Sequence, residues 1–175
     1  VSISSPMLNT KPICNPANPN SCPALVSVGG IVYRDYDNTC LQQNSTDALM
    51  DVKVNLLHNG TLVQQVHTSF AGNYTFEADT GTYTITVDTT GIPFDVVCPA
   101  NRFDSVHVIY YDTTVHAHNF GMHCKPGCDA GIYDLIIGAD ARPASITTVY
   151  LQIMEMATLY GQSCLDSAVG GEVVV

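Results

Sequence analysis

The residues best suited to chemistry are oxygen donors that gather in one short polar stretch. Asp35, Asp37 and Asn38 fall within a single turn, and Asp47 and Asp51 follow where the chain can return to the same end of a sheet. A hard cation takes six to eight oxygen ligands, so clustered carboxylates and carbonyls offer the chemistry of such a site. The same residues also form ordinary turns, in which Asp and Asn side chains accept hydrogen bonds from backbone N–H groups.

Cysteine is the second residue type whose side chain could take part in chemistry. In a Lys-poor chain rich in Thr and Asn, its abundance indicates an oxidising, extracellular compartment and disulfides. An odd count leaves one thiol unpaired. The seven are spread along the chain and mostly stand beside turn residues: Cys14, Cys22, Cys40, Cys98, Cys124, Cys128 and Cys164.

Three disulfide pairings are open to prediction. Cys14 and Cys22 bracket a short Asn/Pro-rich loop and form the simplest local pair. As a disulfide between residues far apart in the sequence we favour Cys40–Cys98, because both residues lie in loops that flank strands of one module. Cys124 and Cys128 pair with each other, or one of the two pairs with Cys164, and the sequence does not choose between these pairings.

A group of histidines is the third candidate. His116 and His118 stand two apart on a predicted strand and so share a face, with His123 and two cysteines nearby. Imidazoles and thiolates are ligands for Zn²⁺ or Cu²⁺. However, cysteines in an oxidising compartment form disulfides, and a strand face tolerates histidine without any ligand role. We favour the interpretation that these histidines lie on a strand face and bind no metal.

Composition excludes several classes of function. The chain has 175 residues, 46% hydrophobic but only 13% charged, and it carries a net charge of -10 with six basic residues and no Trp. Nucleic-acid binding depends on basic residues, and so does binding to an anionic membrane. No apolar run reaches membrane-spanning length. The sequence also lacks the known nucleophile-elbow, metalloprotease and nucleotide-binding motifs, so we predict that the protein is not an enzyme.

Short strands must position these residues. Residues 52–56 and 82–87 alternate apolar and polar side chains, the period of a half-buried strand. The turn Asn59-Gly60 predicts a tight hairpin that returns over residues 62–68. A second hairpin is expected between residues 106–110 and 115–117, and residues 149–160 form either a helix or strands. The spacing of about seven short strands predicts an all-β protein built on an antiparallel β-sandwich.

Changes in composition predict three parts. Residues 1–29 hold five prolines and are expected to be a Pro-rich N-terminal linker or edge segment. Residues 30–121 should form the sandwich. Residues 122–175 supply only three or four strands, too few to close a sandwich, so we expect a partial second Ig-like domain. The chain stops within the apolar run 173–175. We therefore expect more sequence or another chain to complete that domain.

Four motifs appear in the order of a known family. They are Gly30-Ile31-Val32 with the acidic stretch 35–38, then residues 51–56, 72–76 and 81–85. In this order residues 30–121 resemble the SdrD B-like repeat of bacterial surface proteins, a Cna-B or transthyretin-type sandwich. Asn119-Phe120-Gly121 is similar to that family's closing Asp-Phe-Gly. The sequence that follows is similar to the opening of a DUF11-type or Ig-like repeat.

The resemblance implies calcium binding through the acidic loop. The ligands carried over to this chain are Asp35, Asp37, Asn38, Asp47 and Asp51. One departure matters, because Thr39-Cys40 stands where the family has Asp-Gly. A disulfide at Cys40 would replace a metal clamp with a covalent one.

Short Asp-Ser/Thr sequences give a second resemblance. They are similar to the O-glycosylation motif of the Bacteroidetes, which implies a glycoprotein exported by type IX secretion. Three of them stand in the predicted sandwich, at Thr89, Ser105 and Thr113. The fourth contains Ser167.

These observations predict a non-catalytic structural or adhesive module of a long secreted bacterial cell-surface protein, serving as a stalk, spacer or filament unit. The expected partners are neighbouring repeats, the outer-membrane secretion or anchoring machinery and a surface ligand, without nucleic acid or membrane insertion. The alternative is a carbohydrate- or peptide-binding module of a secreted hydrolase. That alternative needs exposed aromatic side chains on one face, for which the candidates are Tyr33, Tyr36, Tyr110 and Tyr111.

Overall fold

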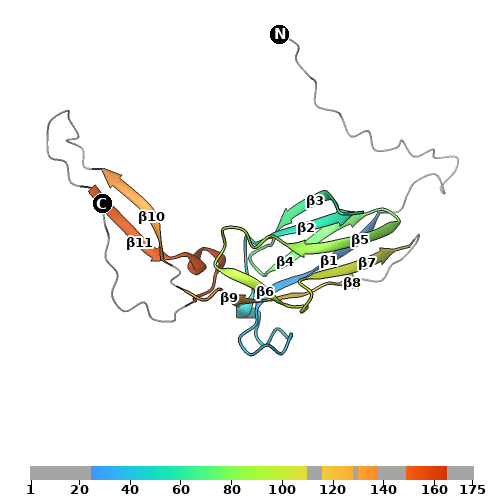
Figure 1. Ribbon diagram of the computed structural model, residues 1–175, viewed down its shortest axis with the longest axis horizontal. Helices are drawn as coiled ribbons and strands as arrows, with labels where there is room; N and C mark the ends of the chain where they lie inside the picture. The colour runs from blue at the N-terminus through green and yellow to red at the C-terminus, as the bar shows by residue number, and fades with distance from the viewer. Residues whose placement is uncertain (1–24, 110–115, 128–129, 138–148, 165–175) are drawn as a thin grey trace, which may run out of the picture.

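The fold is built almost wholly from strands, as predicted. A computed structural model describes residues 25–109, 116–127, 130–137 and 149–164, and within these ranges it contains strands and two short 3-10 helices (Figure 1). The strands are β1 (Val26–Arg34), β2 (Lys53–His58), β3 (Thr61–His67), β4 (Asn73–Ala78), β5 (Gly81–Val87), β6 (Phe94–Cys98), β7 (Phe103–Val108), β8 (His116–Ala117), β9 (Phe120–Cys124), β10 (Ala130–Ile137) and β11 (Val149–Glu155). The helices are η2 (Ser45–Asp47) and η3 (Met156–Tyr160).

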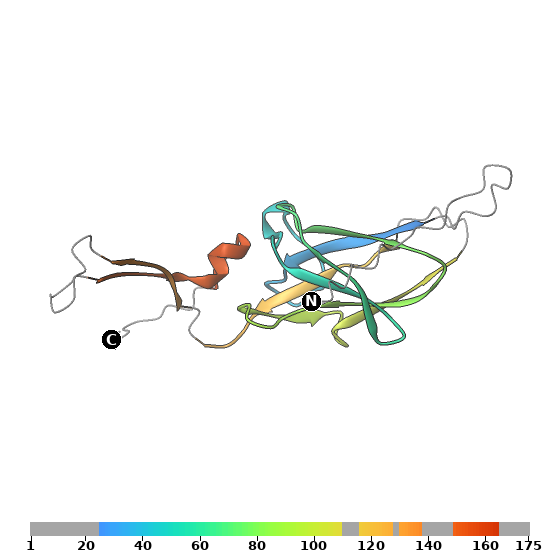
Figure 2. The ribbon, with the colours of Figure 1, turned by 90° about the horizontal axis from the view of Figure 1, so that it is seen from above.

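Two sheets face each other in a sandwich. One has the order β4-β1-β9-β6, with β8 also paired to β1, and the other has the order β3-β2-β5-β7. Pairing is antiparallel except where β1 runs parallel to β8 and β9. Figure 2 shows the two layers edge on, with η3 between the sandwich and the separate β10–β11 sheet.

Local sequence explains the turns. Asn59 and Gly60 adopt left-handed φ values of 52° and 76°, so the predicted β2–β3 hairpin is confirmed. The predicted hairpin between residues 106–110 and 115–117 is wrong, because β7 pairs with β5 in one sheet and β8 pairs with β1 in the other. Residues 149–160 contain a strand, β11, followed by η3.

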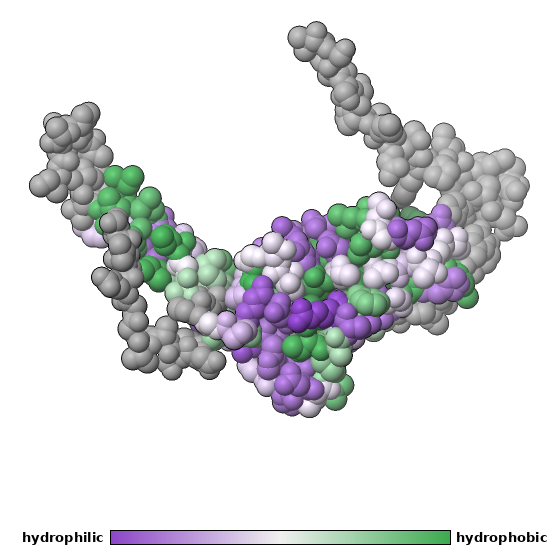
Figure 3. All heavy atoms as spheres, in the orientation of Figure 1, coloured by the Kyte–Doolittle hydropathy of each residue, from purple (hydrophilic) through white to green (hydrophobic). Residues whose placement is uncertain are grey.

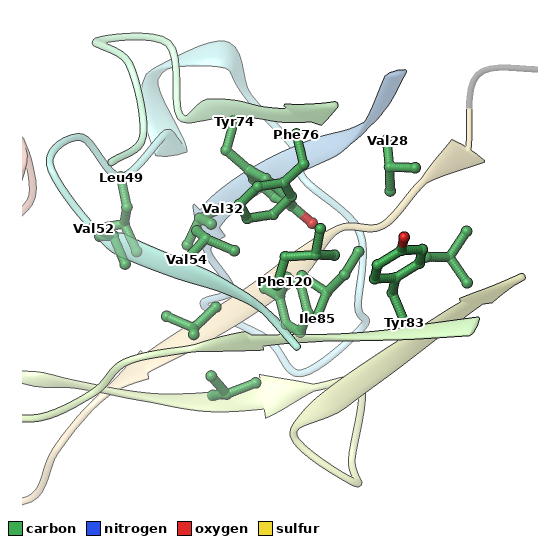
Figure 4. Packing of buried hydrophobic residues seen from close by; sticks show 14 of the residues in the cluster. Val28, Val32, Leu49, Val52, Val54, Tyr74, Phe76, Tyr83, Ile85 and Phe120 are labelled. Atoms are coloured by element: carbon green, nitrogen blue, oxygen red, sulfur yellow. The ribbon is translucent and has the colours of Figure 1, made fainter. Parts of the chain in front are cut away.

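Alternating side chains fill the space between the sheets. Tyr74 and Phe76 of β4 point inward, as do Tyr83 and Ile85 of β5, while Phe120 enters from the central strand β9 (Figure 4). Burial of each such side chain contributes roughly 1.5–3 kcal/mol before the entropy cost of ordering it. The period of two in the sequence therefore becomes the core of the sandwich.

Glycines in β1 let a neighbouring chain segment approach closely. A Cβ on Gly30 would lie 2.0 Å from the carbonyl oxygen of His118, and one on Gly29 would lie 2.4 Å from that of Tyr74. No side chain fits at such distances. Gly30 is therefore needed where the chain crosses from β8 to β9 beside β1, and Gly29 is needed where β4 lies along the opposite side of β1.

The strands of the sandwich extend across both limits expected from composition. β1 begins at Val26, before residue 30, and β9 runs to Cys124, beyond residue 121. Ala157 of η3 is fully buried in the core, and the ring of Tyr160 packs edge-on against Phe94 at 5.9 Å. Among the described residues, no helix is both long enough and apolar enough to cross a membrane.

Candidate functional site

The loop after β1 is organised by the carboxylate of Asp35. This side chain is 1% exposed, and its backbone N–H donates to the Met122 carbonyl of β9 at 2.9 Å. Its two carboxylate oxygens accept hydrogen bonds from the N–H groups of Asp37, at 3.4 Å, and Cys40, at 3.0 Å. Asp35 therefore acts as an internal anchor for the loop.

Asp37 holds the exposed part of the same loop. It accepts hydrogen bonds from the N–H and hydroxyl of Thr39, at 3.2 and 2.7 Å, and from the Gln43 amide. The hydroxyl of Thr39, above all, lowers the pKa of Asp37. Asn38 and Cys40 have φ values of 57° and 62°. Asn tolerates this left-handed conformation, whereas at Cys40 it is held in place by the bond to Asp35.

A disulfide joins this loop to the end of β6. Cys40 pairs with Cys98, with Cα atoms 5.4 Å apart, so the predicted long-range pair is present. Cys98 is buried and Cys40 is exposed. The Cys98 sulfur lies 3.3 Å from Oδ2 of Asp35. An open recess of about 480 Å³ adjoins the disulfide, with Tyr33 and Asp104 among its lining residues.

Gly121 lies where three side chains converge on this site. A Cβ on Gly121 would stand 3.1 Å from the Tyr33 hydroxyl, 3.1 Å from Cβ of Cys98 and 3.2 Å from Cβ of Asp35. The glycine of the Asn-Phe-Gly sequence thus makes room for the site. Burial, followed by the charges of Asp35 and Asp37, raises the pKa of Tyr33, which keeps its phenol neutral.

The five residues predicted to bind calcium have different partners in the structure. Asp35 and Asp37 bind loop groups, and Asn38 lies exposed between them. Asp47 accepts a hydrogen bond from the Asn44 N–H at 2.8 Å at the start of η2. Asp51 contacts Nδ1 of His67 at 2.6 Å on the surface.

Metal-ligand atoms do gather in the described part of the chain, but not as a calcium set. One atom each from Asp35, Cys40 and Cys98 lie within 4.8 Å of one another. Two of the three are sulfurs, and both are committed to a disulfide. A hard cation needs many oxygen ligands, so this group as it stands does not fit Ca²⁺.

The other sequence-based candidates have different bonding partners. His118 is buried and contacts Asp104 through Nδ1 at 2.6 Å, while Cys124 is bonded to Cys164. Cys124 is therefore not a thiolate ligand for the predicted histidine site, and the alternative of Cys164 as its partner is confirmed. The predicted Cys14–Cys22 pair and Cys128 lie outside the described residues.

The glycosylation and aromatic candidates are partly described. Thr89 is half-buried in the turn after β5, and Ser105 is exposed on β7. Tyr33 is buried, so the expectation that it belongs to an exposed aromatic face is wrong. Tyr36 is exposed. The remaining candidates, Thr113, Ser167, Tyr110 and Tyr111, lie outside the described residues.

A docking segment, residues 156–164, was missed by sequence reasoning. Gln162 is buried and donates to the carbonyls of Thr46 and Ala48 at 2.7 and 3.2 Å, while its amide oxygen accepts from the Tyr36 hydroxyl at 2.9 Å. The Met50 N–H donates to the Tyr160 carbonyl at 3.1 Å. These bonds tie the segment to the loops around η2. The sequence signal was Cys164, one of the two partners considered for Cys124.

Arg34 completes the docking segment's contacts. Its guanidinium lies 4.6 Å from the centre of the Tyr36 ring, a cation–π contact, and donates to the Ser163 carbonyl. The Cys124–Cys164 disulfide, with Cα atoms 5.7 Å apart, closes the joint beside the Arg34 guanidinium, which lies 3.8 Å from Sγ of Cys164. The end of the sandwich is thus bonded covalently and by hydrogen bonds to the segment that follows β11.

The β10–β11 sheet carries one aliphatic face. A register shift at Tyr133 aligns three apolar cross-strand pairs, Ile132–Ile153, Leu135–Leu151 and Ile137–Val149, while Gln152 faces Asp134 on the other side. Of these six aliphatic residues all but the half-buried Leu151 are exposed, and Figure 3 shows apolar side chains gathered over this sheet. Without the register shift, each face of the sheet would carry both aliphatic and polar side chains.

Comparison with known proteins gives a family match within the sandwich. Residues 26–102 match the family model described as the SdrD B-like domain. A search of curated proteins found no match. A chain among the solved structures, "The Bacillus anthracis TIE protein", is similar with a TM-score of 0.41 and 12% sequence identity; the match covers 55% of the present chain and 17% of that one.

Proposed function

We propose that this chain, whose residues 26–102 match the SdrD B-like domain, is a non-catalytic structural module of a secreted bacterial cell-surface protein. In this role it is a stiff spacer that holds a binding part of the protein at a distance from the cell. The family match supports an adhesin-type structural module. The extracellular setting is supported by the two disulfides, since such bonds persist in oxidising compartments.

The observation that carries the proposal is the bonded joint at the end of the sandwich. A spacer transmits force and orientation only if consecutive modules are fixed to each other. Here the Cys124–Cys164 bond and the hydrogen bonds of Gln162 fix the docking segment to the sandwich. Domain interfaces without such bonds are expected to move.

The aliphatic face of the β10–β11 sheet supports a neighbouring module. A two-stranded sheet is marginal by itself and gains stability when another layer covers its apolar face. We propose that residues 122–175 begin a second β-domain, completed by further strands of the same protein or by another chain. Slower amide hydrogen exchange of β10 and β11 in the protein isolated with its partners from its natural cells than in this chain alone would support that proposal, and equal exchange would exclude it.

Calcium binding stays a prediction for the acidic loop. The carboxylates of Asp35 and Asp37 already accept hydrogen bonds from the loop itself. A bound ion would have to displace several of these bonds. Thermal melting in excess Ca²⁺ and in EDTA tests the prediction, because a rise in midpoint that disappears in Asp37→Asn would support it and an unchanged midpoint would remove it.

Export by type IX secretion and O-glycosylation at Thr89 and Ser105 belong to the same proposal. Ser105 is exposed on a strand at the edge of its sheet, where a glycan meets no packing obstacle. The intact mass of the protein purified from its natural cells reports the modification. A mass equal to that of the bare sequence would exclude it.

A domain exchange tests the spacer function directly. In the natural protein on living cells, residues 26–164 are replaced by an unrelated sandwich of similar length with a similar rigid joint. Adhesion should persist, because a spacer contributes length and stiffness rather than recognition. Loss of adhesion with normal surface display would favour the alternative of a ligand-binding module.

A further inference from the structure

The group formed by Asp35, Cys40 and Cys98 has the spacing of a metal site. In a tetrahedral zinc site with Zn–O near 2.0 Å and Zn–S near 2.3 Å, an oxygen and a sulfur ligand stand about 3.5 Å apart. The Asp35 Oδ2 and Cys98 Sγ atoms are 3.3 Å apart. These two donors therefore already lie at the separation that two zinc ligands require.

The third donor is within reach of the same point. The ligand atoms of all three residues lie within 4.8 Å of one another, and the Cα atoms of Cys40 and Cys98 are 5.4 Å apart. Two zinc-bound sulfurs stand about 3.8 Å apart, farther than in a disulfide, so one side chain must turn outward. Cys40 is exposed in a loop and has the freedom to do so, whereas Cys98 is buried at the end of β6.

We propose that Asp35, Cys40 and Cys98 bind Zn²⁺ when the Cys40–Cys98 disulfide is reduced and do not bind it while the disulfide is intact. A dithiol reduces the Cys40–Cys98 bond, giving up two electrons and two protons and becoming a disulfide itself. Zn²⁺ then binds the two sulfurs and the Asp35 carboxylate, and two thiol protons leave to solvent. The reduced state is that of the chain before its disulfides form.

The donor set selects the metal. Two thiolates and one carboxylate suit a borderline-soft ion such as Zn²⁺ and not Ca²⁺, which takes oxygen ligands only. The fourth position opens to the recess of about 480 Å³ beside the disulfide, from which water can enter. Water that enters from this recess supplies the fourth ligand.

Cobalt titration of the full chain tests this proposal. The chain is reduced with a phosphine, which leaves the metal free, and is titrated with Co²⁺ as a spectroscopic substitute for Zn²⁺. In a chain with Cys14, Cys22, Cys124, Cys128 and Cys164 replaced by Ser, we expect one equivalent with the absorption of tetrahedral, thiolate-bound cobalt. Zn²⁺ should displace it, and the oxidised chain should not bind.

Three variants give the decision, even where the five-serine chain does not fold. Asp35→Asn should weaken Co²⁺ and Zn²⁺ binding by roughly tenfold or more. Asp37→Asn, which removes the same charge from the same loop, should leave it unchanged. In the otherwise natural chain, Cys40→Ser with Cys98→Ser should remove one equivalent of bound Co²⁺. Equal binding with and without Cys40 and Cys98, or equal effects of the two Asp variants, would overturn the proposal.

Discussion

Cys124, the last residue of β9, is bonded to Cys164, which follows the β10–β11 sheet and the η3 turn. This bond connects the two ends of the segment that leaves the sandwich. The segment therefore departs from and returns to one place on the sandwich.

The first prediction concerns this bond. Replacing Cys124 and Cys164 by Ser should lower the free energy of unfolding by about 4 kcal/mol, because a loop with a sequence separation of 40 is freed in the unfolded chain. Denaturant unfolding of the oxidised protein measures the change. An unchanged midpoint would mean that the hydrogen bonds of the docking segment hold the joint alone.

The second prediction concerns the carboxylate beside the other disulfide. An attacking thiolate reaches exposed Cys40, and Cys98 then leaves as a thiolate 3.3 Å from the charge of Asp35. Like charges at this distance repel, so Asp35→Asn should speed reduction of Cys40–Cys98 by at least about tenfold. Reduction kinetics followed by thiol alkylation and mass spectrometry measure the rate.

That experiment carries its own controls. The rate at Cys124–Cys164 in the same molecule reports any general loosening of the fold. Asp37→Asn removes an equal charge that lies in the same loop. Equal acceleration in both Asp variants would contradict a specific effect of Asp35.

The third prediction separates close approach from backbone conformation. Gly30→Ala places a Cβ 2.0 Å from the His118 carbonyl and should cost more than about 3 kcal/mol or prevent folding. Gly60→Ala meets nothing within 4 Å but has a φ of 76°, so it should cost only about 1 kcal/mol. Chemical denaturation measures the loss of stability in each variant, and similar losses would contradict the role given to Gly30 in β1.

The fourth prediction concerns alkaline pH. Burial, followed by the charge of Asp104, raises the pKa of Tyr74, whose hydroxyl donates to the His118 carbonyl. The folded state favours the neutral phenol, so this stability is present below the pKa of about 10 of an exposed tyrosine. It is lost as pH rises further, because the unfolded chain ionises first.

Unfolding midpoints at about pH 8 and pH 11 test the role of Tyr74. Tyr74→Phe should reduce the loss of stability between the two. Tyr133→Phe, a matched change at an exposed tyrosine of β10, should not. The same alkaline loss in Tyr74→Phe as in the unchanged protein would count against this assignment.

The sequence predicted what depends on short-range patterns. The alternation around Val54 and Ile85 and the turn at Asn59-Gly60 led to the correct strands, and loop positions led to the Cys40–Cys98 pair. Long-range geometry was missed. No local pattern shows that Ala157 enters the core of a sandwich whose last strand, β9, ends at Cys124, more than thirty residues earlier. The sequence also left two roles open for Asp35, because a carboxylate that bonds backbone N–H groups and one that binds a metal have the same sequence.

Stretching single molecules tests the central claim, a disulfide-locked spacer, most directly. With the protein pulled from its two ends in oxidising buffer, the loops closed by the disulfides should not extend. Reduction should then add about 200 Å for the separation of 58 at Cys40–Cys98 and about 140 Å for the separation of 40 at Cys124–Cys164. Full extension of the chain before reduction would contradict the claim.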